Sequence, residues 1–113
     1  MTVLYREEEV VARVSSLTRD RLVEYRAAQV VIPIEGEQGP VYRQLDVARL
    51  ELACDLGEQY EMEPEAIGMV LSLIDQLHGL RAEMREVLRA VEDQPEPVRM
   101  QIADAIRKVR FPE

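Results

Sequence analysis

The chain has 113 residues, 47% of them hydrophobic and 32% charged, with a formal net charge of −8. This composition is typical of a folded domain and excludes a disordered chain. No apolar run approaches the roughly 18 residues of a transmembrane helix, and the first residues are charged, so we expect neither a membrane span nor a signal peptide. The single cysteine, Cys54, excludes a disulfide framework and indicates a reducing, cytoplasmic location.

The acidic charge is unevenly distributed. Residues 1–60 carry seven arginines against eleven acidic residues, and residues 61–95 carry three against eight. Only the tail from Glu96 has a basic excess. This balance argues against a nucleic-acid partner and favours a basic protein partner.

The first elements form a candidate helix-turn-helix. Residues Tyr5–Val14 have the pattern of a short helix, which Ser15 and Ser16 interrupt. A second helix follows, with Thr18 as its N-cap. Two short helices separated by a break of a few residues are typical of this motif.

A two-stranded wing is predicted next. Val30–Ile34 is a β-branched run, Glu35–Pro40 has the composition of a turn, and Val41–Arg43 can pair back as the second strand. A third helix follows, opened at or just before Asp46 and closed near Gly57.

A long helix is predicted from Pro64 to about Val91, roughly 40 Å in length. Its positions at heptad a/d spacing are Ile67, Val70, Ile74, Leu77, Arg81, Met84 and Leu88. A second apolar stripe beside them consists of Leu73, Leu80 and Val87. So small a domain cannot bury both stripes, so we expect one to cover the N-terminal domain and the other to form a homodimer.

Arg81 is the one charged residue in the a/d stripe. Its stem could pack while the guanidinium reaches solvent. Alternatively, it could meet Glu86 or Asp75 of a second helix and fix an antiparallel register.

Two prolines, Pro95 and Pro97, separate the long helix from a C-terminal helix. The predicted organisation is therefore mainly α: a winged domain at 1–60, a dimerisation helix at 61–93 and a helical tail at 94–113.

No catalytic, metal or cofactor site is expected. His78 is the only histidine and has no second histidine or paired cysteine, so a surface or interface position is the simpler interpretation. Cys54 has the spacing of a buried helix position, and Ser15 and Ser16 are interpreted as turn formers.

Three segments carry a family resemblance. Leu17–Tyr25 followed by Val30–Pro33 resembles the helix-turn-helix of the MerR-type superfamily, and Tyr42 before Asp46–Leu50 resembles its segment after the wing. Val70–His78 is more similar to the chaperone modulator (CbpM-like) branch than to the metal- or drug-sensing regulators. The resemblance implies a small homodimer that binds the J-domain of a CbpA/DnaJ-type co-chaperone and restrains it.

The sequence departs from the superfamily where DNA would bind. Gln29 stands where glycine is usual, and acidic residues occupy the second helix and the wing: Asp20, Glu24, Glu35 and Glu37. These four carboxylates could be a solvated face, or they could attract a basic J-domain helix, and against DNA they would add repulsion. Arg19, Arg21 and Arg26 keep the alternative of a MerR-type DNA-binding regulator open.

Overall fold

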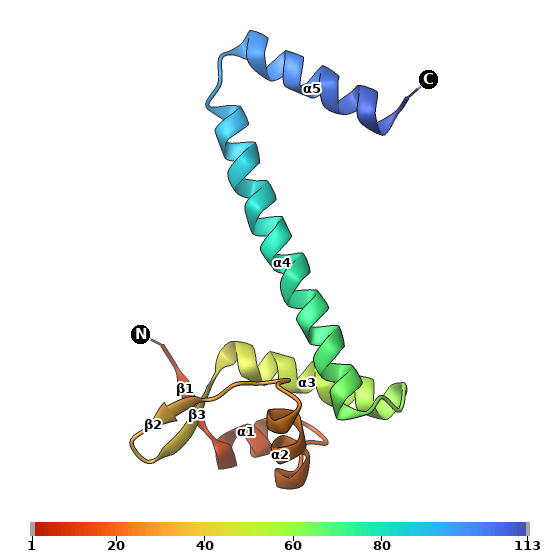
Figure 1. Ribbon diagram of the computed structural model, residues 1–113. Helices are drawn as coiled ribbons and strands as arrows, with labels where there is room; N and C mark the ends of the chain where they lie inside the picture. Colours follow the sequence, from red (N-terminus) through yellow and green to blue (C-terminus); the bar gives the residue numbers. More distant parts are fainter. Residues whose placement is uncertain (1, 113) are drawn as a thin grey trace. The chain divides into compact units, whose positions relative to one another are not determined.

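The computed structural model of the chain describes residues 2–112. This part is mainly α, with five helices and one small antiparallel sheet (Figure 1). It divides into two compact units whose boundary lies within the long helix, between Ile74 and Asp75. The residues of the predicted winged domain and residues 64–74 of the long helix therefore belong to one unit.

The N-terminal unit begins with strand β1 (Leu4–Arg6), followed by helices α1 (Glu7–Arg13) and α2 (Arg19–Ala27). The predicted start of the first helix at Tyr5 is wrong, because Leu4–Arg6 pairs with a later strand and the helix begins only at Glu7. The break at Ser15 and Ser16 is confirmed. The predicted cap is confirmed too, since the Thr18 side chain accepts a hydrogen bond from the Arg21 N–H over 3.1 Å.

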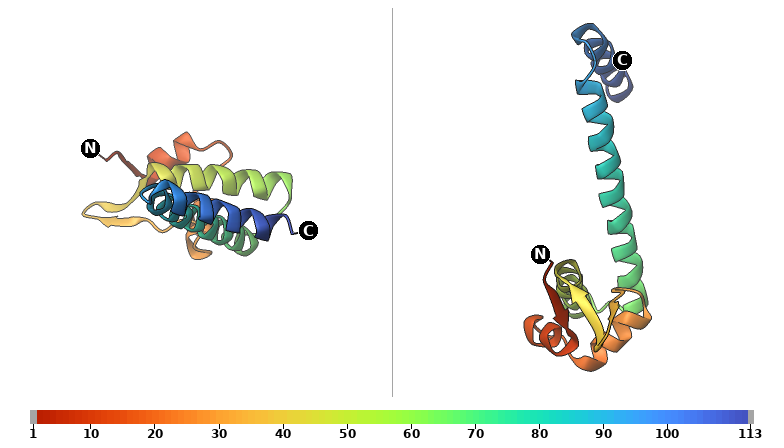
Figure 2. Two further views of the ribbon diagram at one scale, coloured as in Figure 1. Left: turned by 90° about the horizontal axis from the view of Figure 1, so that it is seen from above. Right: turned by 90° about the vertical axis from the view of Figure 1, so that its left-hand side faces the viewer.

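The sheet has three strands in the order β1-β3-β2, where the sequence predicted two (Figure 2). Strand β2 (Ile34–Gly36) and strand β3 (Gly39–Arg43) form the hairpin, and Tyr5 of β1 lies opposite Tyr42 of β3. Of the predicted strand Val30–Ile34 only Ile34 is in the sheet. Val30 and Val31 are instead buried in the core, which holds the chain away from β3.

Helix α3 (Gln44–Gln59) starts where expected, but it passes the predicted end at Gly57. Asp46, fully buried, accepts hydrogen bonds from the Arg43 backbone N–H over 2.9 Å and from the Arg43 guanidinium over 3.1 Å. This carboxylate therefore satisfies the backbone N–H of Arg43, the N-cap residue of α3, as the N3 residue of a capping box does.

The core of the N-terminal unit takes residues from all three of its shorter helices and from the sheet. Its largest fully buried side chains are Tyr42, Leu22, Leu50, Ile67 and Leu71. The last two come from the first turns of helix α4 (Pro64–Glu92). Close packing here is visible at Gly68, where an added Cβ would lie 2.6 Å from the Ala28 carbonyl oxygen at the end of α2.

The C-terminal unit consists of the remainder of α4 and helix α5 (Glu96–Arg110), so the predicted helical tail is confirmed. No residue of α5 is buried. Among residues 2–112, no helix is long and apolar enough to cross a membrane.

Candidate functional site

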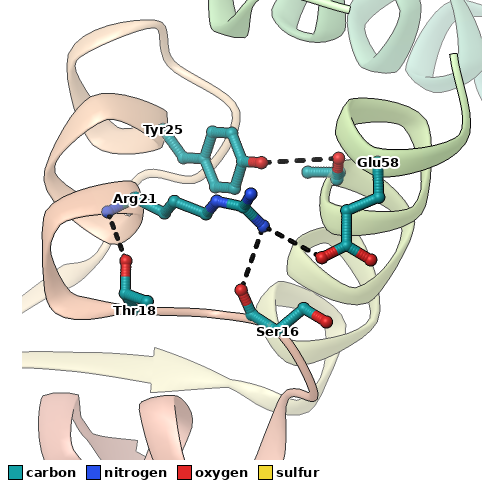
Figure 3. Close-up of polar contacts among 6 residues, drawn as sticks. Ser16, Thr18, Arg21, Tyr25 and Glu58 are labelled. Atoms are coloured by element: carbon teal, nitrogen blue, oxygen red, sulfur yellow. Dashed lines mark hydrogen bonds and ion pairs between the residues drawn. The ribbon is translucent and has the colours of Figure 1, made fainter. Parts of the chain in front are cut away.

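Helix α2 is fixed to the N-terminal unit by polar contacts on its inner side (Figure 3). The Arg21 guanidinium donates hydrogen bonds to the Ser16 carbonyl over 3.0 Å and to the Glu58 carboxylate over 3.4 Å. The Tyr25 hydroxyl donates to the Ala53 carbonyl over 3.5 Å. The Glu58 contact raises the pKa of Arg21 above its usual value. Because these contacts hold α2 against α3, the face of α2 that points away from α3 has a fixed orientation in the unit.

The end of α2 is closed by a left-handed residue. Gln29 has φ of 61°, and its N–H donates to the Arg26 carbonyl while the Val30 N–H donates to the Tyr25 carbonyl. This pair of bonds is the Schellman motif, which usually has glycine at the left-handed position. The Arg49 side chain then donates to the Val30 carbonyl over 2.8 Å and fixes the segment that follows. The turn is therefore made without glycine, at a cost in backbone strain.

A groove of about 580 Å³ lies between α2 and the segment leading into β2. Its lining consists of Val23, Arg26, Ala27, Gln29, Val31, Ile32, Pro33 and Glu35. Two of its apolar side chains are open to solvent, Val23 at 56% and Ile32 at 67% exposure. The groove therefore places exposed apolar side chains next to polar ones, among them Arg26 and Glu35.

The four predicted partner-binding carboxylates are all exposed, but they do not form one cluster. Asp20 and Glu24 lie one helical turn apart on the outer face of α2, and Glu35 lines the groove. Glu37 lies in the hairpin turn and lines a separate hollow with Arg6. Within residues 2–112 none of the four forms an ion pair.

The three arginines that kept DNA binding open have different surroundings. Arg19 lies 3.2 Å from the Glu7 carboxylate, and Arg21 is held by Glu58. Arg26 lines the groove, next to the buried Tyr42 hydroxyl. Burial raises the pKa of Tyr42, and the charge of Arg26 opposes this rise. Arg26 is thus the one member of this trio that faces the groove.

The apolar members of the groove were missed in the sequence. Ile32 belongs to a β-branched run that was interpreted as a strand, and Val23 falls between charged residues of α2. A detectable signal was the spacing of Leu22 and Tyr25, which places Val23 off the buried face. The exposure of Ile32 depends on the burial of Val30 and Val31 and could not be inferred from the pattern alone.

The predicted dimer stripe of α4 divides along its length. Ile67 is fully buried in the core of its own unit, so it has no surface to offer a second chain, and its assignment to the interface is corrected. Val70 and Ile74 are half-buried, and Ile74 packs against the same core. The exposed part of the stripe comprises Leu77, Arg81, Met84 and Leu88. The expectation that one whole stripe covers the N-terminal domain is therefore wrong, because only the first turns of the a/d stripe complete the core and both stripes are exposed from Leu77 onward.

The remaining reactive residue types lie apart from the groove. Cys54 is buried as predicted, and burial raises the pKa of its thiol, which disfavours the nucleophilic thiolate. Ser16 has φ of 69° and forms the turn between α1 and α2. His78 is exposed on α4. In the described part of the chain no group of His, Cys, Asp and Glu side chains could hold a metal ion.

Comparison of this chain with protein-family models, with curated proteins and with solved structures yields no match.

Proposed function

We propose that this chain is a non-catalytic modulator that binds the J-domain of a CbpA/DnaJ-type co-chaperone and restrains it. In this proposal the N-terminal unit is a MerR-type winged helix-turn-helix, in which α1 and α2 form the motif and the β2–β3 hairpin forms the wing. The bound modulator covers the J-domain surface that otherwise engages the ATPase domain of the chaperone.

The observation that carries the proposal is the character of the α2 face. A winged helix-turn-helix normally presents this helix and its wing to DNA with basic side chains. Here the corresponding surface has a groove of mixed apolar and polar lining, in which Val23 and Ile32 are exposed and Arg26 is the one basic residue. Its outer carboxylates are Asp20, Glu24 and Glu35. Apolar anchors surrounded by acidic residues suit a basic, amphipathic protein helix.

The alternative of a DNA-binding regulator has less support. A DNA-binding face releases counterions through free Lys and Arg side chains. Arg21 is held by the Ser16 carbonyl and by Glu58, whereas the exposed pair of Arg19 with Glu7 holds Arg19 only weakly. The exposed carboxylates of α2 would repel phosphates. Binding of any duplex with sub-micromolar affinity at physiological salt would favour this alternative.

Homodimerisation through α4 is part of the proposal. The exposed apolar residues of α4 beyond the core, Leu77, Met84 and Leu88, are between 49% and 60% exposed and repeat at heptad spacing. An exposed apolar stripe of this kind is typical of a protein interface. Arg81 interrupts the stripe and remains a candidate for fixing its register.

Charge reversal tests the proposed surface. The variant Asp20→Lys/Glu24→Lys should slow association with an isolated J-domain, most strongly at low salt, because each rim charge contributes about 0.2–1 kcal/mol. The matched control is Glu51→Lys/Asp55→Lys, which has the same charge change and spacing on an exposed part of α3. Equal slowing by both variants, or no J-domain binding by the wild type, would overturn the proposal.

Substitution of the apolar anchor gives a second readout. Ile32→Asp should accelerate dissociation from the J-domain, because it places an unpaired charge in the groove. Leu45→Asp is the control, since Leu45 is 59% exposed on α3. Similar dissociation rates for the two variants would show that the groove is not the contact.

A further inference from the structure

Helix α5 has the seam of a coiled-coil helix, and no other element among residues 2–112 buries this seam. Four of its apolar residues follow one another at spacings of four, three and four, which is an a/d repeat: Val98, Ile102, Ala105 and Val109. Ile106, 52% exposed, lies beside this repeat. Val109 is 81% exposed, and no residue of the helix is buried within the chain. An apolar helix face of this kind is typically buried against a second molecule.

Helix α4 also has a row of exposed apolar residues. Leu73, Leu80 and Val87 lie beside the a/d stripe and are 63%, 62% and 59% exposed. A two-stranded seam uses the a and d positions only, so a second α4 on that stripe would leave this row open. Helices with a third apolar row typically contact two neighbours in a bundle.

The two surfaces agree in length and in charge. At 1.5 Å per residue the α5 seam extends over about 17 Å and the α4 row over about 21 Å. Glu83, three residues after Leu80 and four before Val87, borders the α4 row, and Glu86 follows on the next row. Arg99 and Lys108 border the α5 seam on its two sides, and both are exposed. Lys108 lies 3.5 Å from Asp104 of its own helix, but an exposed pair of this kind holds it only weakly.

We infer that α5 of one copy packs on the Leu73, Leu80 and Val87 row of α4 in a second copy, so that helices α4 and α5 of two chains form a helical bundle. The inference rests on the α4 dimer proposed above. A membrane surface is a poorer cover, because the α5 seam has no Trp, Phe or Leu with which to enter it.

Cross-linking between two different chains tests the inference. One chain carries Leu80→Cys and a size tag, the other carries Ala105→Cys, and the mixture is treated with a short bifunctional maleimide. The expected product joins the two chains at the mass of the mixed dimer. The wild type is a background control, since its thiol is buried, and Met100→Cys is the matched control on the opposite side of α5.

Each outcome has one meaning. A mixed product from Ala105→Cys that exceeds the Met100→Cys product by about tenfold or more supports the inference, in line with a single docked geometry. Equal yields, or no product although the mixture sediments as a dimer, overturn it and leave the α4 dimer intact. A product only in the double variant Leu80→Cys/Ala105→Cys, at monomer mass, means that α5 folds back on its own chain. A wild type that sediments as a monomer contradicts the α4 dimer itself.

Discussion

The contact between α4 and the end of α2 can be tested with a single methyl group. In Gly68→Ala the new Cβ would lie 2.6 Å from the Ala28 carbonyl oxygen, closer than real Cβ contacts allow, and the neighbour is backbone. Forcing atoms into a packed site costs about 1–3 kcal/mol of the free energy of unfolding. Alanine in place of glycine inside a helix contributes about 1 kcal/mol in the opposite direction. We therefore expect a net loss of up to about 2 kcal/mol.

The same helix provides the matched control. Gly79 also lies inside α4, but a Cβ there would meet nothing within 4 Å. Gly79→Ala should therefore raise the free energy of unfolding by about 1 kcal/mol through helix propensity alone. The assay is urea unfolding followed by circular dichroism, at one protein concentration because the proposed dimer would contribute to apparent stability. If Gly68→Ala is stabilised as much as Gly79→Ala, α4 does not approach α2 as described.

Three further predictions concern the N-terminal unit. Asp46→Ala should lower the free energy of unfolding by about 1–3 kcal/mol in urea titrations, since it removes the acceptor of the Arg43 bonds, whereas exposed Asp55→Ala should change it by less than about 0.5 kcal/mol. Gln29→Gly should raise the thermal midpoint, with a gain of about 0.5–1 kcal/mol, because glycine adopts the left-handed conformation without strain; a lower midpoint would contradict the Schellman end of α2. Burial raises the pKa of Cys54, so the thiol of the unfolded chain deprotonates first and the free energy of unfolding should fall as pH rises above about 8.5. In Cys54→Ala this fall should be shallower than in the wild type, and an identical fall in the two proteins would refute a buried thiol.

Local patterns in the sequence were sufficient for most helices. The Thr18 cap, the proline start of α4 and the proline break before α5 act through neighbouring residues, so they could be read directly. Strand β1 could not, because three residues form it only by pairing with β3 across much of the sequence. The pairing of Tyr5 with Tyr42 is a long-range contact, and it outweighs the local helical pattern of residues 5–14.

The surface proposed for docking could be predicted from the sequence only in part. The acidic residues of α2 were found because charge departs visibly from a DNA-binding pattern, but the groove beside them depends on how Val30 and Val31 enter the core. Similarly, the heptad pattern of α4 located an apolar stripe without showing that Ile67 is used by its own unit. A sequence pattern shows that an apolar residue is expected to be buried, and only the packing shows which element buries it.

Hydrogen exchange of the wild-type chain, with and without an isolated J-domain, tests the central claim most directly. The proposed docking surface predicts slower amide exchange in α2 and in residues 30–36, with no change on the exposed face of α3. Unchanged exchange in α2 and residues 30–36, with slowing confined to α4 and α5 or absent altogether, would contradict the claim that the groove binds the J-domain.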